Sequence, residues 1–190
     1  MFRPFYFIIF FGISACGAAK YSHADLYSPL ELQDLETYSR FCPGGQGGET
    51  VKVVLDSSLK NLPQIVYQPP LTKTLITGGF ECRFGTFHGA IDLVDLRGTP
   101  VTAIADGLVK FSGQLRLTGK TVIIFHPESG VESLYGHGDE NLVKVGDKIA
   151  RGQKIQLLGN TGSSTGPHLH LQISYKNALI NPCALIGCKN

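Results

Sequence analysis

Two histidines one residue apart, His168 and His170, have side chains and a spacing that could support metal chemistry. In a β-strand, residues i and i+2 point to the same face, so both imidazoles would lie side by side. Leu169, Leu171 and Ile173 would then face a hydrophobic core. On its own, the pair is more often explained as two surface histidines on a half-buried strand. Further residues are therefore needed to favour a metal site.

A second pair of metal-binding side chains lies upstream, where His88 and Asp92 follow a glycine-rich segment at residues 78–85. Their even spacing can place both on one strand face. Zinc binds histidine nitrogen and carboxylate oxygen, and a catalytic zinc site has three protein ligands and one open position for water. The residues therefore predict a zinc (Zn²⁺) site formed by His88, Asp92 and either His168 or His170.

Short strands and tight turns must position these side chains. The chain contains 23 glycines, no tryptophan, and short runs of valine, isoleucine and threonine between turn residues. Residues 121–125 and 131–137 are predicted to form a hairpin around a turn at 127–130. One face of the returning strand is expected to carry Val131, Ser133, Tyr135 and His137.

Two stretches that begin at Gly98 and Gly146 are weakly alike, because each runs turn, strand, glycine turn, strand. Such a repeat favours a sandwich of two similar hairpin units. We therefore predict an all-β antiparallel fold, a sandwich or barrel-sandwich hybrid, preceded by a short and partly helical N-terminal extension.

Residues 20–72 are predicted to form this extension and residues 73–190 the main domain, with two prolines at 69–70 near the boundary. A helix should begin at the Ser-Pro-Leu-Glu sequence from residue 28, where serine is a suitable N-cap and glutamate closes a capping box. Residues 51–55 are predicted as a strand.

The first residues indicate export. Arg3 precedes an apolar run at 5–13, and small residues follow up to Ala19, which is the order found in a secretory signal peptide. The apolar run is too short to cross a bilayer as a helix. Residues 1–19 are therefore predicted to be removed from the mature chain.

A lipoprotein signal is the alternative interpretation of the same residues. Ile-Ser-Ala-Cys at 13–16 resembles the lipobox of bacterial lipoproteins, in which case the signal is residues 1–15 and Cys16 carries a membrane-anchoring lipid. Both alternatives stay open. Either one predicts an exported chain, located in the periplasm or cell envelope or secreted.

Cysteine usage is consistent with export. Once Cys16 is lipidated or removed, two disulfides in three possible connectivities can form among Cys42, Cys82, Cys183 and Cys188. The favoured pairs are Cys183–Cys188, which closes a short loop, and Cys42–Cys82, which ties the extension to the domain. Their spacing does not suit a structural zinc site.

Charge argues against a nucleic-acid partner. The formal net charge is only +2, and no run of lysine and arginine alternates with aromatic residues. The sequence does not indicate an oligomeric state.

Over roughly residues 73–186 the chain resembles the lysostaphin- and LytM-type zinc metalloendopeptidases, which cut peptidoglycan peptides. The likeness rests on several motifs: Phe87-His88-Gly89-Ala90-Ile91-Asp92, Gly98-Thr99-Pro100-Val101, Ala103, Asp106-Gly107, Tyr135-Gly136-His137, Val145-Gly146-Asp147, and the run GNTGSSTGPHLH at 159–170.

The resemblance implies a role for each of five residues. His88, Asp92 and His170 correspond to the zinc ligands, and His137 and His168 to the catalytic pair beside the metal. It also implies a peptidoglycan peptide as substrate. This chain departs from the family's usual pattern with Ala90 in place of glycine, Gly138 in place of leucine, and Leu171-Gln172 in place of Phe-Glu.

The chemistry of amide hydrolysis agrees with these roles. Zinc lowers the pKa of bound water towards about 7 and polarises a carbonyl. One neutral imidazole can accept the water's proton, and a second can hydrogen-bond the developing oxyanion. No His-Glu-x-x-His sequence is present, so two histidines must replace the glutamate base of that metalloprotease class.

The sequence leaves two alternative functions. The first is a catalytically inert protein of the same fold that binds the wall or activates another wall hydrolase, which loss of a metal ligand would favour. The second is an unrelated His-x-His barrel metalloprotein of cupin type. That site needs a further acid and histidine downstream, and residues 171–190 contain neither glutamate nor histidine.

The other histidines and two serines are expected to have structural rather than catalytic roles. His126 ends a predicted strand and is expected to pack or to cap a turn, and His23 is expected to be solvated. Ser163 and Ser164 are interpreted as turn residues rather than nucleophiles.

Overall fold

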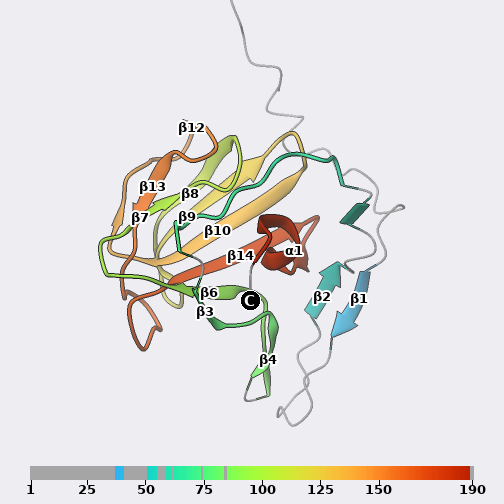
Figure 1. Ribbon diagram of the computed structural model, residues 1–190, viewed down its shortest axis with the longest axis horizontal. Coiled ribbons are helices and arrows are strands. Elements are labelled where there is room, and N and C mark those ends of the chain that lie inside the picture. The colour runs from blue at the N-terminus through green and yellow to red at the C-terminus, as the bar shows by residue number, and fades with distance from the viewer. Residues whose placement is uncertain are drawn as a thin grey trace, which may run out of the picture. The chain divides into compact units, whose positions relative to one another are not determined.

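A computed structural model of the chain describes residues 37–40, 51–54, 59–60, 62–73, 75–83 and 85–188 (Figure 1). All of them belong to one compact unit, Glu31–Asn190. The predicted signal segment with Cys16, His23, the helix predicted from Ser28, and Cys42 lie outside the described residues. The domain boundary at residue 73 also remains a prediction.

The described elements are fifteen strands and one short helix. In chain order they are β1 (Thr37–Arg40), β2 (Val51–Val54), β3 (Leu75–Gly78), β4 (Glu81–Arg83), β5 (Thr86–His88), β6 (Ile91–Val94), β7 (Pro100–Thr102), β8 (Gly107–Leu115), β9 (Gly119–His126), β10 (Val131–Gly138), β11 (Glu140–Asn141), β12 (Lys148–Ile149), β13 (Lys154–Leu157), β14 (Leu169–Tyr175), β15 (Ala178–Ile180) and α1 (Pro182–Ile186). The predicted all-β class is confirmed.

A ten-stranded sheet forms the centre of the fold, in the order β1-β2-β15-β14-β10-β9-β8-β12. Strand β6 also pairs with β14, and β3 pairs with β6. Figure 1 shows β8, β9, β10 and β14 running side by side. The described strands pair antiparallel except for the short parallel contact between β15 and β2. The described strands leave this sheet open rather than closed into a barrel.

The two similar hairpin units predicted from the sequence exchange partners. Strand β7 of the first unit pairs with β13 of the second, whereas β12 of the second pairs with β8 of the first. Gly98 and Gly146 open the two units with φ angles of 84° and 88°. These left-handed conformations suit glycine, so the repeated glycine reflects the same turn in each unit.

The hydrophobic core lies behind β9, β10 and β14, whose residues alternate between buried and more exposed positions. Residues from the predicted extension contribute to the same core, namely Val54, Leu62 and Leu71. At 51–54 the structure shows the strand predicted for residues 51–55. The described part of the extension therefore packs on the domain rather than standing apart from it.

A chain of buried polar groups crosses the core beside β9. His126 is fully buried, with Nδ1 2.8 Å from the Asp106 carbonyl oxygen and Nε2 2.7 Å from Ser133 Oγ. Ser133 Oγ lies 3.0 Å from the Tyr135 hydroxyl, which accepts the backbone N–H of Ile104 at 3.0 Å. A neutral His126 donates Nδ1–H to the carbonyl and accepts at Nε2 from the serine. His126 thus packs in the core, as expected from the sequence.

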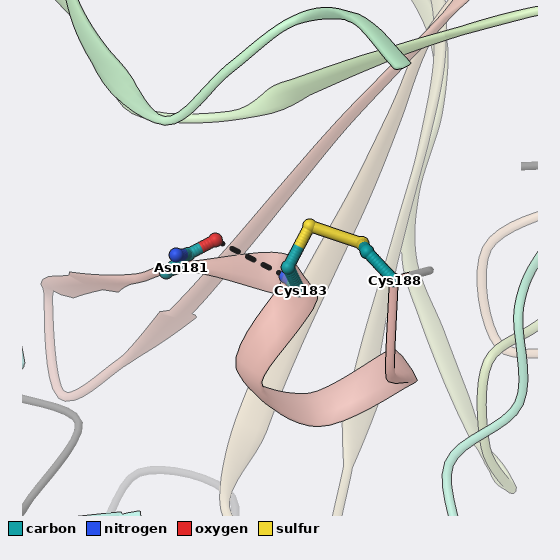
Figure 2. Close-up of a disulfide and its surroundings, with 3 residues drawn as sticks. All are labelled: Asn181, Cys183 and Cys188. Carbon is teal, nitrogen blue, oxygen red and sulfur yellow. Dashed lines mark hydrogen bonds between the residues drawn. A yellow bond between two sulfur atoms is a disulfide. The ribbon is translucent and has the colours of Figure 1, made fainter. Parts of the chain in front are cut away.

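The single described helix, α1, is held at both ends. Asn181 caps its start by accepting the backbone N–H of Cys183 at 3.1 Å, and Gly187 ends it with φ 67°. A disulfide joins Cys183 to Cys188 across this helix (Figure 2). Cys82 is also disulfide-bonded, and its predicted pairing with Cys42 stays a prediction. In the described part of the chain, no helix has the length and apolar character needed to cross a membrane.

We predict that the buried imidazole makes the stability of the fold pH-dependent. Burial lowers the pKa of His126 below 6.5, and the Asp106 carbonyl and charge oppose this only in part. The unfolded chain therefore binds a proton that the folded chain does not. The stabilisation that comes from a neutral His126 is complete above pH 6.5 and is lost as the pH falls below that value.

Urea unfolding at about pH 7.5 and about pH 5.5 measures this loss. The His126→Gln variant should lose less free energy of unfolding between these two pH values than the wild type, whatever its stability at the higher one. An equal loss in the two proteins would contradict the assignment to His126.

Candidate metal centre

Strand β14 presents the His-x-His pair as its alternation requires. Leu169, Leu171 and Ile173 are at most 1% exposed, whereas His168, just before the strand, and His170 are only partly buried. His170 lies opposite Asp92 of β6 on one side and opposite Gly136 of β10 on the other. The predicted division of this segment into a core face and a histidine face is confirmed.

His88 and Asp92 do not share one strand face, so that prediction is wrong. His88 ends β5, which pairs with β4, and Asp92 lies in β6, which pairs with β14 and β3. The chain bends at Ala90 between the two strands. The two side chains still meet, with His88 Nε2 3.2 Å from Asp92 Oδ1, because the bend brings one strand end beside the next.

Three ligand atoms converge on one point. His88 Nε2 lies 3.3 Å from His170 Nδ1, and each of these nitrogens lies 3.1–3.2 Å from Asp92 Oδ1. Ligand atoms about 2.05 Å from a tetrahedral zinc lie about 3.3 Å from one another. Among the described residues this is the group that could hold a metal ion. The spacing and the donor types both fit zinc.

Hydrogen bonding to the backbone prepares His88 for this role. Its Nδ1 lies 2.7 Å from the Gly79 carbonyl oxygen, which can only accept a proton. A neutral His88 therefore carries its proton on Nδ1 and directs the Nε2 lone pair at the other two ligand atoms. Lone pairs that face one another repel, and a cation at their meeting point removes the repulsion.

Asp92 remains ionised in this cluster. Burial alone would raise its pKa, but the neighbouring rings of His170 and His88 and a hydrogen bond from Arg83 hold the pKa well below its usual range. Arg83 Nη2 contacts Asp92 Oδ2 at 3.1 Å, on the side away from the histidines. Arg83 cannot be identified from the sequence alone, because nothing in its local pattern shows that β4 reaches β6.

His137 lies on the face opposite to the one predicted. The register of β9 and β10 shifts between Tyr135 and Gly138, so β10 contains one extra residue. His137 has φ 64° there, and its ring lies 4.7 Å from that of His168 and 5.5 Å from that of His170. The bulge therefore turns His137 away from the core face of Tyr135 and towards the other histidines.

Backbone carbonyls also orient the two histidines beside the ligand group. His137 Nδ1 lies 2.7 Å from the carbonyl oxygen of Thr161, and His168 Nδ1 lies 2.8 Å from that of Gly166. Both neutral rings then have their lone pair at Nε2. His168 Nε2 is 3.6 Å from Asp92 Oδ1, so it faces the ligand group.

The ionisation of His137 is shifted towards the neutral form. Burial lowers its pKa, and the nearby rings of His168 and His170 act in the same direction, while the Thr161 carbonyl and Asp92 oppose them. A neutral imidazole with a free lone pair can accept a proton. The arrangement thus combines three metal-ligand atoms with a neutral base at close range.

Ser164, near the centre, behaves as a turn residue. Ser164 Oγ donates to the Gly166 carbonyl at 2.8 Å and lies 3.2 Å from His168 Nδ1. His168 is thereby held from the side away from the ligand group. Two further residues, Thr161 and Gln156, contact the bulge that carries His137, and no local sequence signal indicates either contact.

Comparison with known proteins places these residues in a described family. Residues 86–182 match the model of Peptidase family M23. The chain is 40% identical over 96 residues to an uncharacterized metalloprotease of Haemophilus influenzae, covering 50% of this chain and 20% of that protein. It is 36% identical over 122 residues to the DD-carboxypeptidase/endopeptidase Mpg of Neisseria meningitidis, covering 61% of this chain and 28% of Mpg.

A third relative is the murein hydrolase activator NlpD of Salmonella dublin, 38% identical over 103 residues, with 52% of this chain and 27% of NlpD covered. The matched regions thus span between a fifth and just over a quarter of the lengths of these three relatives.

Two solved structures resemble this fold. A zinc-containing peptidase from Vibrio cholerae is 31% identical with a TM-score of 0.58, covering 64% of this chain and 40% of that one. The antimicrobial peptidase lysostaphin from Staphylococcus simulans is 27% identical with a TM-score of 0.55, covering 60% of this chain and 49% of that one.

We predict that Gly78 is required for tight metal binding. A Cβ atom at this position would lie 2.2 Å from Asp92 Oδ2 and 2.8 Å from Arg83 Nη1, so Gly78→Ala must displace the carboxylate. Displacing groups that orient a ligand costs about 10- to 100-fold in metal affinity. Zinc titration of the metal-free protein against a coloured chelator measures this change.

Gly166→Ala is the matched control, because a Cβ atom there meets nothing within 4 Å. Its zinc affinity should equal that of the wild type. Equal affinities in the Gly78→Ala and Gly166→Ala variants would show that the close approach at Gly78 does not position the ligand.

Proposed function

Because the chain belongs to peptidase family M23, we propose that it is an exported zinc metalloendopeptidase that hydrolyses peptide bonds in peptidoglycan. The observation that supports this proposal most directly is the set of ligand atoms of His88, Asp92 and His170, 3.1–3.3 Å apart. We assign these three residues as the zinc ligands, and His137 and His168 as the catalytic pair.

The substrate class is inferred from relatives. Mpg is named a DD-carboxypeptidase/endopeptidase, and a further relative from Vibrio cholerae is named a peptidoglycan DD-endopeptidase. The second of these names gives peptidoglycan as the material on which that enzyme acts. The peptide crosslinks and stem peptides of peptidoglycan are therefore the proposed substrate of this chain.

The bound zinc would supply a water of lowered pKa and a polarised substrate carbonyl. His137 acts as the general base in this proposal, since its pKa is lowered and its Nε2 lone pair is available. It takes a proton from the attacking water while the new C–O bond forms. It then gives that proton to the amine nitrogen as the C–N bond breaks, so the proton balance is closed.

His168 acts on the substrate oxygen in this proposal. Its Nδ1 is engaged by the Gly166 carbonyl, so only Nε2 can reach the substrate. A hydrogen bond from Nε2 requires the imidazolium form, which stabilises the negative charge that develops on the carbonyl oxygen. The two histidines therefore have different roles although the backbone orients them in the same way.

An inert wall-binding protein or hydrolase activator is the second candidate function, and the match to NlpD supports it. The two candidates differ in what they require of the site. An activator needs no ligand set, whereas this chain retains three convergent ligand atoms and two oriented imidazoles. Zinc binding without any peptide release from peptidoglycan would favour the activator.

Location in the cell envelope follows from the proposed substrate. Export by the N-terminal signal, and lipid anchoring through Cys16, remain proposals based on the sequence. The Cys183–Cys188 disulfide agrees with an oxidising compartment.

Metal analysis tests the ligand assignment. The purified wild type should hold about one zinc per chain, and His88→Ala, Asp92→Ala and His170→Ala should each lose it, because each removes one of three protein ligands. Elemental analysis after dialysis measures the content. Full occupancy in Asp92→Ala would contradict the ligand set.

Hydrolysis assays test the catalytic pair. His137→Ala and His168→Ala should retain zinc but lose activity by about 10²- to 10⁴-fold, the range typical of a lost general acid or base. Digestion of peptidoglycans of different wall types, followed by mass spectrometry of the fragments, measures the rate and identifies the bond cut. Wild-type rates in either variant would refute its role.

A further inference from the structure

The bulge that carries His137 interrupts the hydrogen-bond ladder between β9 and β10. Pairing is regular up to Tyr135 and Val122 and resumes at Gly138 and Lys120. Backbone carbonyls beside such an interruption lose their partner in the neighbouring strand. When they are buried, another donor must satisfy them.

Gln156 supplies that donor from β13, which belongs to the three-stranded sheet β11-β13-β7. Its side chain is fully buried, and Nε2 lies 3.0 Å from the carbonyl oxygen of Lys120 and 3.4 Å from that of Tyr135. Nε2 also contacts Asn141 Oδ1 at 2.9 Å. All three partners are acceptors, so the amide nitrogen rather than the oxygen must face the bulge.

Packing alone does not explain a glutamine at this position. Its Oε1 is buried without a hydrogen-bond partner among the described residues. A buried acceptor without a partner is destabilising, and an apolar side chain of similar size would avoid that cost. The amide is therefore better explained by the groups that its nitrogen contacts.

Gly138 and Gln156 form a matched pair. A Cβ atom on Gly138 would lie 2.3 Å from Gln156 Cδ and 2.5 Å from its Cγ and Nε2. A side chain at position 138 could therefore not coexist with this glutamine in its present place. The glycine at 138 thus leaves space for the side chain that contacts the bulge.

We propose that Gln156 is a positioning residue for His137, an inference that rests on the proposed function. Gln156 holds the carbonyls on both strands of the bulge, and the bulge holds His137 at φ 64°. The left-handed conformation is costly for histidine and persists only where its surroundings impose it. It keeps Nδ1 of His137 on the Thr161 carbonyl, 2.7 Å away.

The variant that tests this is Gln156→Leu, which keeps the volume and removes the amide. Its imidazole nitrogen NMR spectrum should show the His137 Nδ1–H signal shifted or lost to exchange, because the ring leaves the Thr161 carbonyl. Zinc content should be unchanged, since no proposed ligand is touched. Peptidoglycan hydrolysis should lose kcat by about tenfold or more with KM little altered.

Ser133→Ala is the matched control. Like Gln156, Ser133 is fully buried. It lies in β10, the strand that carries His137, but its side chain contacts His126 and Tyr135 instead of the bulge. It should lower the melting temperature without changing the His137 signal or kcat. If Gln156→Leu lowers the melting temperature but leaves both readouts at wild-type values, Gln156 is only a core residue and the proposal fails.

The NMR readout does not need turnover, so it separates this inference from the proposed function. An inactive wild type with a His137 signal that changes in Gln156→Leu would refute the proposed hydrolysis and support the positioning role. An active wild type, with an unchanged His137 signal and unchanged kcat in Gln156→Leu, would support the proposed hydrolysis and refute the positioning role.

A double-variant cycle tests the matched pair independently. Gly138→Ala should lower the melting temperature by several degrees in the wild type, because the added Cβ meets Gln156. In the Gln156→Ala background the clashing atoms are absent, so the same change should cost little. Equal losses in both backgrounds would contradict the pairing of these two positions.

Discussion

The register of β14 between β6 and β10 is the constraint on which the candidate metal centre depends. It sets His170 opposite Asp92 on one side and opposite Gly136 on the other. A slip of one residue would turn the histidines into the core and expose Leu169 and Leu171. Burying such a leucine fully contributes about 1.5–3 kcal/mol, so core packing fixes the place of the ligands.

Irregular backbone completes what the regular strands begin. The bend at Ala90 changes the direction of the chain between His88 and Asp92, yet the two side chains stay in contact. The bulge at His137 moves one side chain from the core face to the site face. An isolated bridge between Gly159 and His168 holds the residue just before β14. Each irregularity adds one side chain to a group that straight strands could not assemble.

Backbone carbonyls give the centre its electrostatic order. His88, His137 and His168 each place Nδ1 at 2.7–2.8 Å from a carbonyl oxygen, which sets the tautomer of the neutral ring. Asp92 supplies the negative charge and shares its two oxygens between the histidines and Arg83. The arrangement favours a cation inside and leaves His137 beside it as a proton acceptor.

Much of the fold and of the candidate metal centre could be predicted from local sequence. The period-two pattern of residues 168–173 determined which side chains of β14 are buried, and the glycine and proline turns determined the all-β class, because both depend on short-range geometry. Likewise, the two cysteines five residues apart, Cys183 and Cys188, indicated a loop that a disulfide could close. The family resemblance indicated which five residues to examine together.

Tertiary structure alone decided how those residues meet. The local pattern predicted His88 and Asp92 on one strand face, and His137 on the same face as Tyr135. Both predictions failed, because the bend at Ala90 and the bulge at His137 are set by distant partners. Arg83 and Gln156 were missed for the same reason. Their partners lie on other strands, and no spacing along the chain records a contact that forms only when separate strands pack together.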